Sequence, residues 1–204
     1  MKKRKGAFLL CAVFLFSWLL SSCFIPENFK AHVALHKDGT YTFTYEGILT
    51  YATARAAYVK RQLSAKDEAE IKKLEKEFAK DSSFKKVAYL GAGQFKVAYE
   101  KKGKITAPFY FMGKDSKFFS IRQIKGKNGG DLAEIKSFQA GGKERRELKE
   151  IDVKINGELK VETNGRVIKH NAKSTPGLFG LLSGYKWDIK SAADPAPYML
   201  VNLE

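Results

Sequence analysis

The chain has 204 residues, of which 37 are Lys or Arg and 22 are Asp or Glu, giving a formal net charge of +15 at pH 7. This length suits a single domain that buries about 70% of the surface of its unfolded chain. Only two cysteines are present, Cys11 and Cys23, which excludes a disulfide-rich scaffold. We therefore expect a basic globular domain that is stabilised by packing alone.

Residues 1–23 are typical of a bacterial secretory signal that ends in a cysteine. A positive segment at 2–5 precedes the apolar segment Ala7–Leu20. A signal-peptide core needs about 7 to 15 apolar residues, whereas a transmembrane helix needs about 20. The length of the segment thus favours a cleaved signal over the alternative, an uncleaved transmembrane anchor.

The sequence Leu20-Ser21-Ser22-Cys23 resembles the lipobox of bacterial lipoproteins. The resemblance implies that a diacylglyceryl group is joined to the sulfur of Cys23 and that the chain is cut just before this residue. Cleavage would leave 182 of the 204 residues and 33 of the 37 basic ones, so the positive charge belongs to the domain. We expect a lipoprotein signal peptide at 1–22, a short lipidated tether at 23–30 and one extracytoplasmic domain at 31–204.

The first element predicted after the tether is a β-hairpin. Its strands, at 31–37 and 40–47, flank Asp38-Gly39, which is a type I′ turn signal. One face of the second strand is entirely aromatic, with Tyr41, Phe43 and Tyr45. An aromatic face could line a ligand cleft, but aromatics at a period of two are more typical of a core, and we interpret them so.

Two helices are predicted next. Apolar residues recur at helical spacing over Leu49–Leu63, which indicates an amphipathic helix. A second helix is expected at about 65–80, because Ser64 and Asp67 fit a capping box. Its many charged residues have both signs, which is typical of a solvated helix face.

Aromatic and β-branched runs separated by glycine-rich turns predict strands over the rest of the chain. We expect strands at 85–90, 94–101, 105–112 and 117–125, a loop at 126–130, a three-strand meander at 150–170 with turns at Asn156-Gly157 and Asn164-Gly165, and further strands at 185–189 and 198–203. This order predicts an α+β fold, a largely antiparallel β-sheet or partly closed barrel with two helices inserted after the first hairpin.

No residue pattern typical of a catalytic or metal site is evident. His32 and His36 are four residues apart, but on the predicted strand this spacing separates them by about 13 Å, too far for one metal ion. Gly91-Ala92-Gly93 is followed by a predicted strand rather than the helix of a dinucleotide-binding loop. In Gly180–Gly184 the serine is one position too late for a nucleophile elbow. We therefore expect a protein that is not an enzyme and has no cofactor or metal.

The basic charge and one apolar segment predict a role at a membrane. For an exported protein, anionic lipid or an acidic envelope polymer is a more available partner than nucleic acid; a basic surface without a single ligand is the alternative. The segment 176–184 lies between Lys173 and Lys186 and could enter a lipid interface through Leu178, Phe179, Leu181 and Leu182. Burial of this segment at one end of the sheet is the alternative.

The order of the predicted elements resembles that of the LppM-type lipoproteins. The resemblance is carried by Cys23, the hairpin around Asp38-Gly39, the two helices and the ending formed by 164–172 and 185–189. It implies an extracytoplasmic α+β domain with lipid-like ligands and provides no catalytic residue. Some members carry a carboxy-terminal membrane helix, whereas this sequence has a polar predicted strand before Glu204.

Together, these features predict a protein that is lipid-anchored at the cell membrane or the outer membrane and faces away from the cytoplasm. We expect a non-enzymatic binding module for lipid or for an acidic envelope component. The alternative is a structural or assembly factor that contacts another envelope protein. The sequence leaves the ligand and the oligomeric state open.

Overall fold

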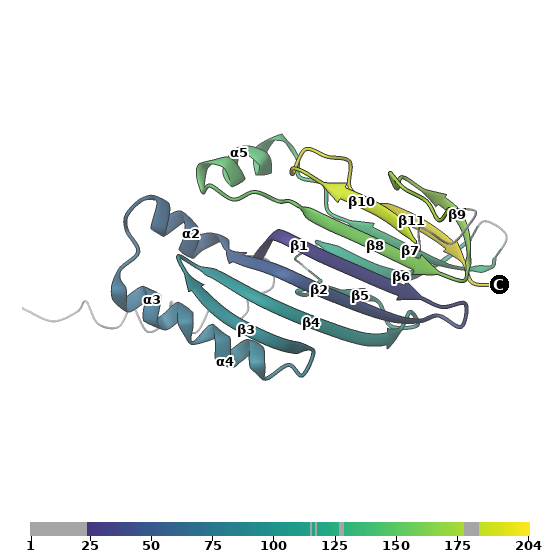
Figure 1. Ribbon diagram of the computed structural model, residues 1–204, viewed down its shortest axis with the longest axis horizontal. Helices are drawn as coiled ribbons and strands as arrows, with labels where there is room; N and C mark the ends of the chain where they lie inside the picture. The colour runs from purple at the N-terminus through teal and green to yellow at the C-terminus, as the bar shows by residue number, and fades with distance from the viewer. Residues whose placement is uncertain (1–23, 115, 117, 127–128, 178–183) are drawn as a thin grey trace, which may run out of the picture.

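The computed structural model describes residues 24–204 except 115, 117, 127–128 and 178–183. Its strands form two sheets, which Figure 1 shows as layers with the second largely behind the first. The first sheet is mixed and has the order β10-β8-β1-β2-β4-β3; the second is antiparallel, with the order β5-β6-β7-β11-β9. The α+β fold class is confirmed, with open sheets rather than a closed barrel.

The first sheet contains β1 (Phe24–Leu35), β2 (Thr40–Tyr51), β3 (Phe84–Gly91), β4 (Gln94–Lys104), β8 (Gly157–Thr163) and β10 (Tyr185–Ile189). The second contains β5 (Phe109–Tyr110), β6 (Phe119–Lys125), β7 (Asp131–Ser137), β9 (Arg166–His170) and β11 (Tyr198–Asn202). The helices are α2 (Ala52–Val59), α3 (Ala65–Lys72), α4 (Leu74–Ala79) and α5 (Gly142–Glu150).

The chain enters the first sheet earlier than predicted. β1 begins at Phe24, whose side chain is only 5% exposed, so the prediction of a tether over 24–30 is wrong. The reason is packing, because the ring of Phe24 lies 5.4 Å from that of Tyr51 and 5.1 Å from that of Phe78. The hairpin turn also differs from type I′, since of Asp38 and Gly39 only the glycine has a positive φ.

The two helices after the first hairpin are present, with changed boundaries. Leu49 is buried in β2, and the first helix covers only Ala52–Val59. The predicted capping box at Ser64 is confirmed: the Ser64 side chain accepts from the Asp67 backbone N–H, and the Asp67 carboxylate accepts from that of Ser64. The second predicted helix is divided at Lys73 into α3 and α4.

The predicted meander over 150–170 is wrong. Residues 142–150 form α5, no strand precedes Gly157 in this region, and β8 and β9 belong to different sheets. β8 lies parallel to β1 and buries Leu159 and Val161 in the first sheet, whereas β9 pairs with β11. The sequence also missed β7, and within 105–112 only Phe109–Tyr110 forms a strand.

Aromatic side chains form the core between the two sheets. Phe43 of β2 is fully buried, and its ring centroid lies 4.9 Å from that of Phe119 and 5.1 Å from those of Phe109 and Phe111. The interpretation of the β2 aromatic face as core is therefore confirmed. The helix α4 covers the same face of the first sheet as the second sheet does, through Phe78. The other face of the first sheet is exposed.

Burial of tyrosines in this core makes the stability dependent on pH in the alkaline range. Burial raises the pKa of Tyr99 from 10.0 to about 12, so the unfolded chain loses this proton before the folded one does. We expect the free energy of unfolding to fall as the pH rises from 10 towards 12, and to fall less steeply in a Tyr99→Phe variant. Urea unfolding at a series of pH values measures this, and equal slopes in the two proteins would contradict it.

Candidate functional site

The residues that the sequence predicts as contacts with lipid are only partly described. Cys23 and the apolar residues Leu178, Phe179, Leu181 and Leu182 lie outside the described residues. Lys173 and Lys186 lie together, since the backbone N–H of Lys173 donates to the Lys186 carbonyl at 3.0 Å. The Lys173 ammonium group donates to the Asp188 carbonyl at 2.9 Å, and that of Lys186 lies 4.0 Å from Glu158.

These two lysines lie far along the first sheet from Phe24. Lys186 pairs with Lys160, which pairs with His32 of β1. His32 is eight residues beyond Phe24, a distance of about 26 Å along a strand. A lipid anchor on Cys23 would therefore be attached near one end of the first sheet. The two lysines that flank the predicted lipid-contacting loop lie about 26 Å further along the sheet.

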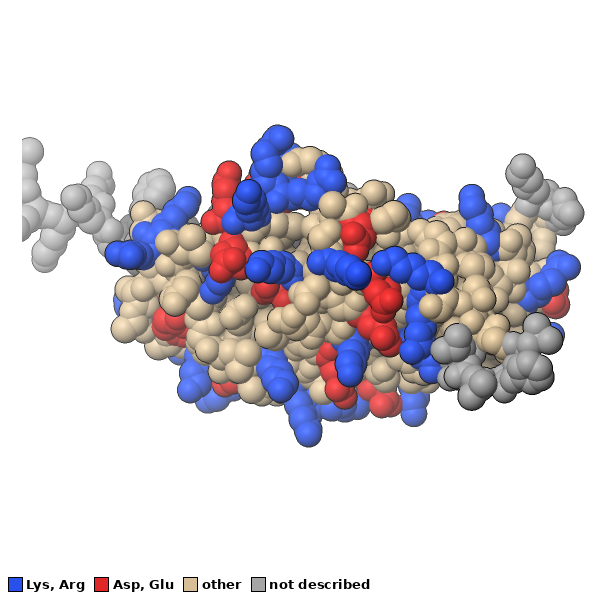
Figure 2. Space-filling model, turned by 45° about the horizontal axis from the view of Figure 1, so that its top comes forward, with Lys and Arg blue, Asp and Glu red and all other residues tan. Residues whose placement is uncertain are grey.

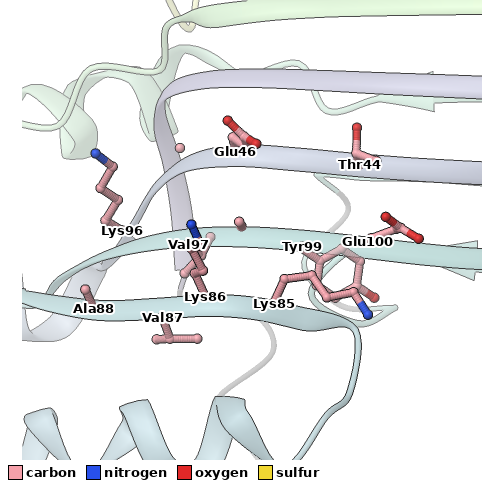
Figure 3. A pocket seen from close by; sticks show the side chains of 12 residues that line it. Thr44, Glu46, Lys85, Lys86, Val87, Ala88, Lys96, Val97, Tyr99 and Glu100 are labelled. Atoms are coloured by element: carbon pink, nitrogen blue, oxygen red, sulfur yellow. The ribbon is translucent and has the colours of Figure 1, made fainter.

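A hollow with a volume of about 880 Å³ lies on the exposed face of the first sheet. Small side chains such as Thr44, Ala88 and Ala98 line its floor, and Lys86, Lys96, Glu46 and Glu100 are among its charged residues. Figure 3 shows Lys96, Glu46 and Glu100 spread along the strands rather than converging on one point. This arrangement of mixed charges is typical of a solvated sheet face.

A smaller and more apolar pocket of about 340 Å³ lies at the amino-terminal end of β1. It forms because β8 pairs with β1 only from Phe29 onwards, which leaves residues 24–26 at an open edge of the sheet. Its apolar lining includes Phe24, Pro26, Phe118, Phe138, Leu148 and Ile155. The charged residues that line it are Glu144 and Glu147, both on α5.

The helix α5 covers this pocket without being packed into the core. Its residues are exposed except for Leu148, which is half-buried and lines the pocket. Just after the helix, the Arg55 guanidinium donates to the Ile151 carbonyl and lies 3.2 Å from the Asp152 carboxylate. Contacts with α2 thus hold the carboxy-terminal end of α5 in place over the pocket.

A basic groove lies on the other side of α5. It has a volume of about 360 Å³ and shares Leu148 and Ile155 with the apolar pocket. Its cations are Arg145, Lys149, Lys154 and Lys190. In the described part of the chain, none of these four forms an ion pair, whereas the carboxylate in the groove, that of Asp152, is paired with Arg55. The groove is therefore suited to an anion.

A buried carboxylate fixes the wall shared by the two cavities. Glu27 is 7% exposed and accepts hydrogen bonds from the Thr50 hydroxyl, from the Gln94 amide at 3.1 Å and from the Lys154 backbone N–H at 3.0 Å. The last bond ties the segment that contains Ile155 to β1. All of these partners belong to the protein, which indicates a structural role for Glu27.

Sequence reasoning missed this site for identifiable reasons. α5 has almost no apolar residues, so the helical hydrophobic pattern is absent. The sequence did contain a signal for this helix. It is rich in helix-favouring residues, and it has Lys143 and Glu147 at i,i+4, whose charged atoms lie 3.7 Å apart. Glu27 was assigned to the tether, where no partner was expected.

Other site types were sought in the described parts of the chain. Within residues 24–204 and outside the gaps given above, no group of three or more His, Cys, Asp or Glu side chains is placed to hold a metal ion. Over the same residues, no helix has the length and apolar character needed to cross a membrane.

Comparison with known proteins gives only a weak resemblance, at the level of structure. No protein-family model matches the chain, and the comparison with curated proteins finds no significant match. Among solved structures, the chain is similar to the NMR structure of the folded domain of LppM from Mycobacterium tuberculosis, with 11% identity and a TM-score of 0.41. The match covers 89% of this chain and 90% of that chain. A likeness of this extent assigns neither a ligand nor a site residue.

Proposed function

We propose that this chain is a lipid-anchored, extracytoplasmic protein of the cell envelope whose domain binds an anionic lipid beside α5 and catalyses no reaction. The observation that supports the proposal is that an apolar cavity and a basic cavity share one wall. An apolar pocket and a basic groove meet at Leu148 and Ile155, on the two sides of one helix. An amphipathic ligand matches this pair of surfaces better than a wholly polar or wholly apolar one.

The apolar pocket is suited to part of an acyl chain. Its volume of about 340 Å³ falls within the range of about 300 to 1,000 Å³ that is usual for ligand sites. Each methylene moved from water into such a pocket contributes roughly 0.8 kcal/mol. Its lining is provided mainly by aliphatic and aromatic side chains from β1, α5 and the segments at 118, 138 and 155.

The basic groove is suited to the headgroup. Arg145, Lys149, Lys154 and Lys190 form a group of cations that can attract a phosphate or carboxylate. On the opposite side of α5, Glu144 and Glu147 line the apolar pocket and would repel an anion. The charges on α5 therefore favour one orientation of the lipid, with its headgroup towards the groove.

The alternative function is that of a structural or assembly factor, and a different surface favours it. The exposed face of the first sheet carries the hollow of about 880 Å³ and side chains of both signs, which could contact another envelope protein. The two functions differ in what accompanies the protein on purification. A binding module retains lipid, whereas an assembly factor retains a protein partner and no lipid.

A Leu148→Glu variant tests lipid binding. A carboxylate on the shared wall would be desolvated by an acyl chain, so we expect at least about tenfold less co-purifying lipid than in the parent protein. Glutamate is a good helix former and Leu148 is only half-buried, so α5 should persist. The measurement is lipid extraction and mass spectrometry of protein purified from membranes.

The matched control is Ile168→Glu, which places the same charge at a residue of β9 that is 51% exposed. We expect this control to retain the lipid of the parent protein. Equal lipid content in all three proteins would exclude the α5 site. A parent protein that carries no lipid but a stable protein partner would favour the assembly function instead.

A further inference from the structure

We infer that one end of the molecule, formed by α2, the β3–β4 turn and α5, lies directly against the membrane surface. Figure 1 shows these elements at the same end, where β1 also begins. We call it the α2 end. The inference rests on the lipid anchor of the proposed function and adds the orientation of the domain and the side chains that contact the bilayer.

Because β1 begins at Phe24, Cys23 is joined to the folded domain without a flexible linker. Phe24 follows Cys23 directly and is already buried in the sheet. Consecutive Cα atoms are about 3.8 Å apart, so a lipid on Cys23 would be attached within one residue of the folded domain. A flexible stalk of many residues would permit every orientation, whereas this attachment holds the α2 end close to the bilayer.

The α2 end also carries most of the exposed large apolar side chains. Four such side chains stand out in the described part of the chain: Tyr58 at 51% exposed, Val59 at 41%, Leu90 at 53% and Ile168 at 51%. The first two lie at the end of α2, and Leu90 precedes the β3–β4 turn. Ile168 lies on β9, at the other end of the molecule (Figure 1).

Hydrogen bonds hold the elements of the α2 end together. The Tyr51 backbone N–H, just before α2, donates to the Gly93 carbonyl in the β3–β4 turn at 2.8 Å. From α2, Arg55 reaches the Ile151 carbonyl beyond α5, and its guanidinium lies 5.3 Å from the centre of the Tyr58 ring. The exposed apolar residues therefore lie on a connected surface rather than on independent loops.

Cations accompany the apolar residues at this end. Lys60 and Arg61 follow Val59 directly, and α5 contributes Arg145 and Arg146. In Figure 2, the end at the left, which α2, α3 and α5 form in Figure 1, shows both basic and acidic side chains beside uncharged surface. Apolar side chains that enter the interface, with Lys and Arg at the level of anionic headgroups, are characteristic of membrane-contacting surfaces.

This orientation explains the position of the proposed lipid site. Because α5 belongs to the α2 end, the apolar pocket and the basic groove lie near the bilayer, from which a lipid would enter them. The loop between Lys173 and Lys186 begins and ends about 26 Å further along the first sheet from Phe24. It is the competing membrane contact that the experiment must exclude.

The absence of other thiols in the processed chain allows a direct test. Apart from Cys11 in the signal, the sequence contains only Cys23, so a cysteine introduced elsewhere is the one free thiol once Cys23 carries lipid. We would prepare Tyr58→Cys, Leu90→Cys, Ile168→Cys and Lys186→Cys in the full chain. Each processed protein is labelled with an environment-sensitive fluorophore and reconstituted into vesicles of phosphatidylcholine and phosphatidylglycerol that contain spin-labelled lipid.

We expect the spin-labelled lipid to quench the label at positions 58 and 90 at least about threefold more than at 168 and 186, because only the former enter the interface. Tyr58, Leu90 and Ile168 have similar exposure, so the contrast among them reports position rather than accessibility. All three are surface sites, where substitution should leave the fold intact.

Two results would overturn the inference in different ways. The first is quenching at 168 or 186 that equals or exceeds the quenching at 58, in a protein whose Cys23 is lipidated. This result excludes the inferred orientation but does not contradict the lipid anchor of the proposed function. Labelling of the parent protein, which has no introduced cysteine, would show a free Cys23. That result removes the anchor of the proposed function, and the inferred orientation with it.

Discussion

Replacing Phe43 with alanine is expected to reduce the free energy of unfolding by about 3 to 5 kcal/mol, the usual cost of emptying a buried phenylalanine site. Phe43 is fully buried and contacts Phe109 and Phe119 of the second sheet and Phe111, which directly follows β5. The substitution therefore removes packing between the sheets as well as the contact with Tyr99 within the first sheet. Urea unfolding followed by circular dichroism and by tryptophan fluorescence measures the loss.

The control for this prediction is Ile168→Ala, which truncates a large apolar side chain that is 51% exposed. We expect it to change the unfolding free energy by less than about 0.5 kcal/mol. If Phe43→Ala cost no more than this control, the two sheets would not share the aromatic core described above. A Phe43→Leu variant, which fills most of the site, should lie between the two.

Replacing Glu27 with alanine is expected to cost about 3 kcal/mol, because it leaves several hydrogen-bond donors without their acceptor in a dry site. The Thr50 hydroxyl, the Gln94 amide and the Lys154 backbone N–H all donate to this carboxylate. Thr50 is fully buried, so water does not readily replace the lost acceptor. The same urea titration at pH 7 measures the change.

The matched control is Glu46→Ala, since Glu46 is an exposed carboxylate on the neighbouring strand β2. We expect it to be nearly neutral. Glu27→Gln keeps one acceptor oxygen and should cost less than Glu27→Ala. Equal losses for Glu27→Ala and Glu46→Ala would show that the buried hydrogen bonds contribute nothing net. Since Lys154 precedes Ile155 of the pocket wall, Glu27→Ala should also reduce the co-purifying lipid.

Features that depend on neighbouring residues were predicted well. The capping box of α3 needs only Ser64 and Asp67, three residues apart, and it is present. The alternation of Tyr41, Phe43 and Tyr45 assigned these aromatics to one buried face, because successive side chains of any strand point to opposite sides. Both features depend only on residues that are close together in the sequence, so the sequence alone is sufficient to predict them.

Features that depend on distant partners were predicted poorly. The run 157–170 has the alternation and the Asn-Gly turn of a hairpin, yet β8 joins β1 and β9 joins β11. The local pattern is the same whether two strands pair with each other or with distant partners, and β8 pairs with a strand more than a hundred residues away in the chain. Phe24–Lys30 similarly has a composition that is typical of a tether. Only the packing of Phe24 on Tyr51 and Phe78 shows that this segment belongs to β1.

By itself, the sequence determined the α+β class, the helices after the first hairpin, the aromatic face of β2 and the expectation of a lipid anchor at Cys23. Each follows from periodicity, capping or a short motif, which act over a few residues. Only the tertiary structure decided the division into two sheets, the start of β1 at Phe24 and the paired cavities beside α5. The walls of these cavities come from segments near residues 25, 118, 138, 148, 155 and 190, and only long-range packing brings such segments together.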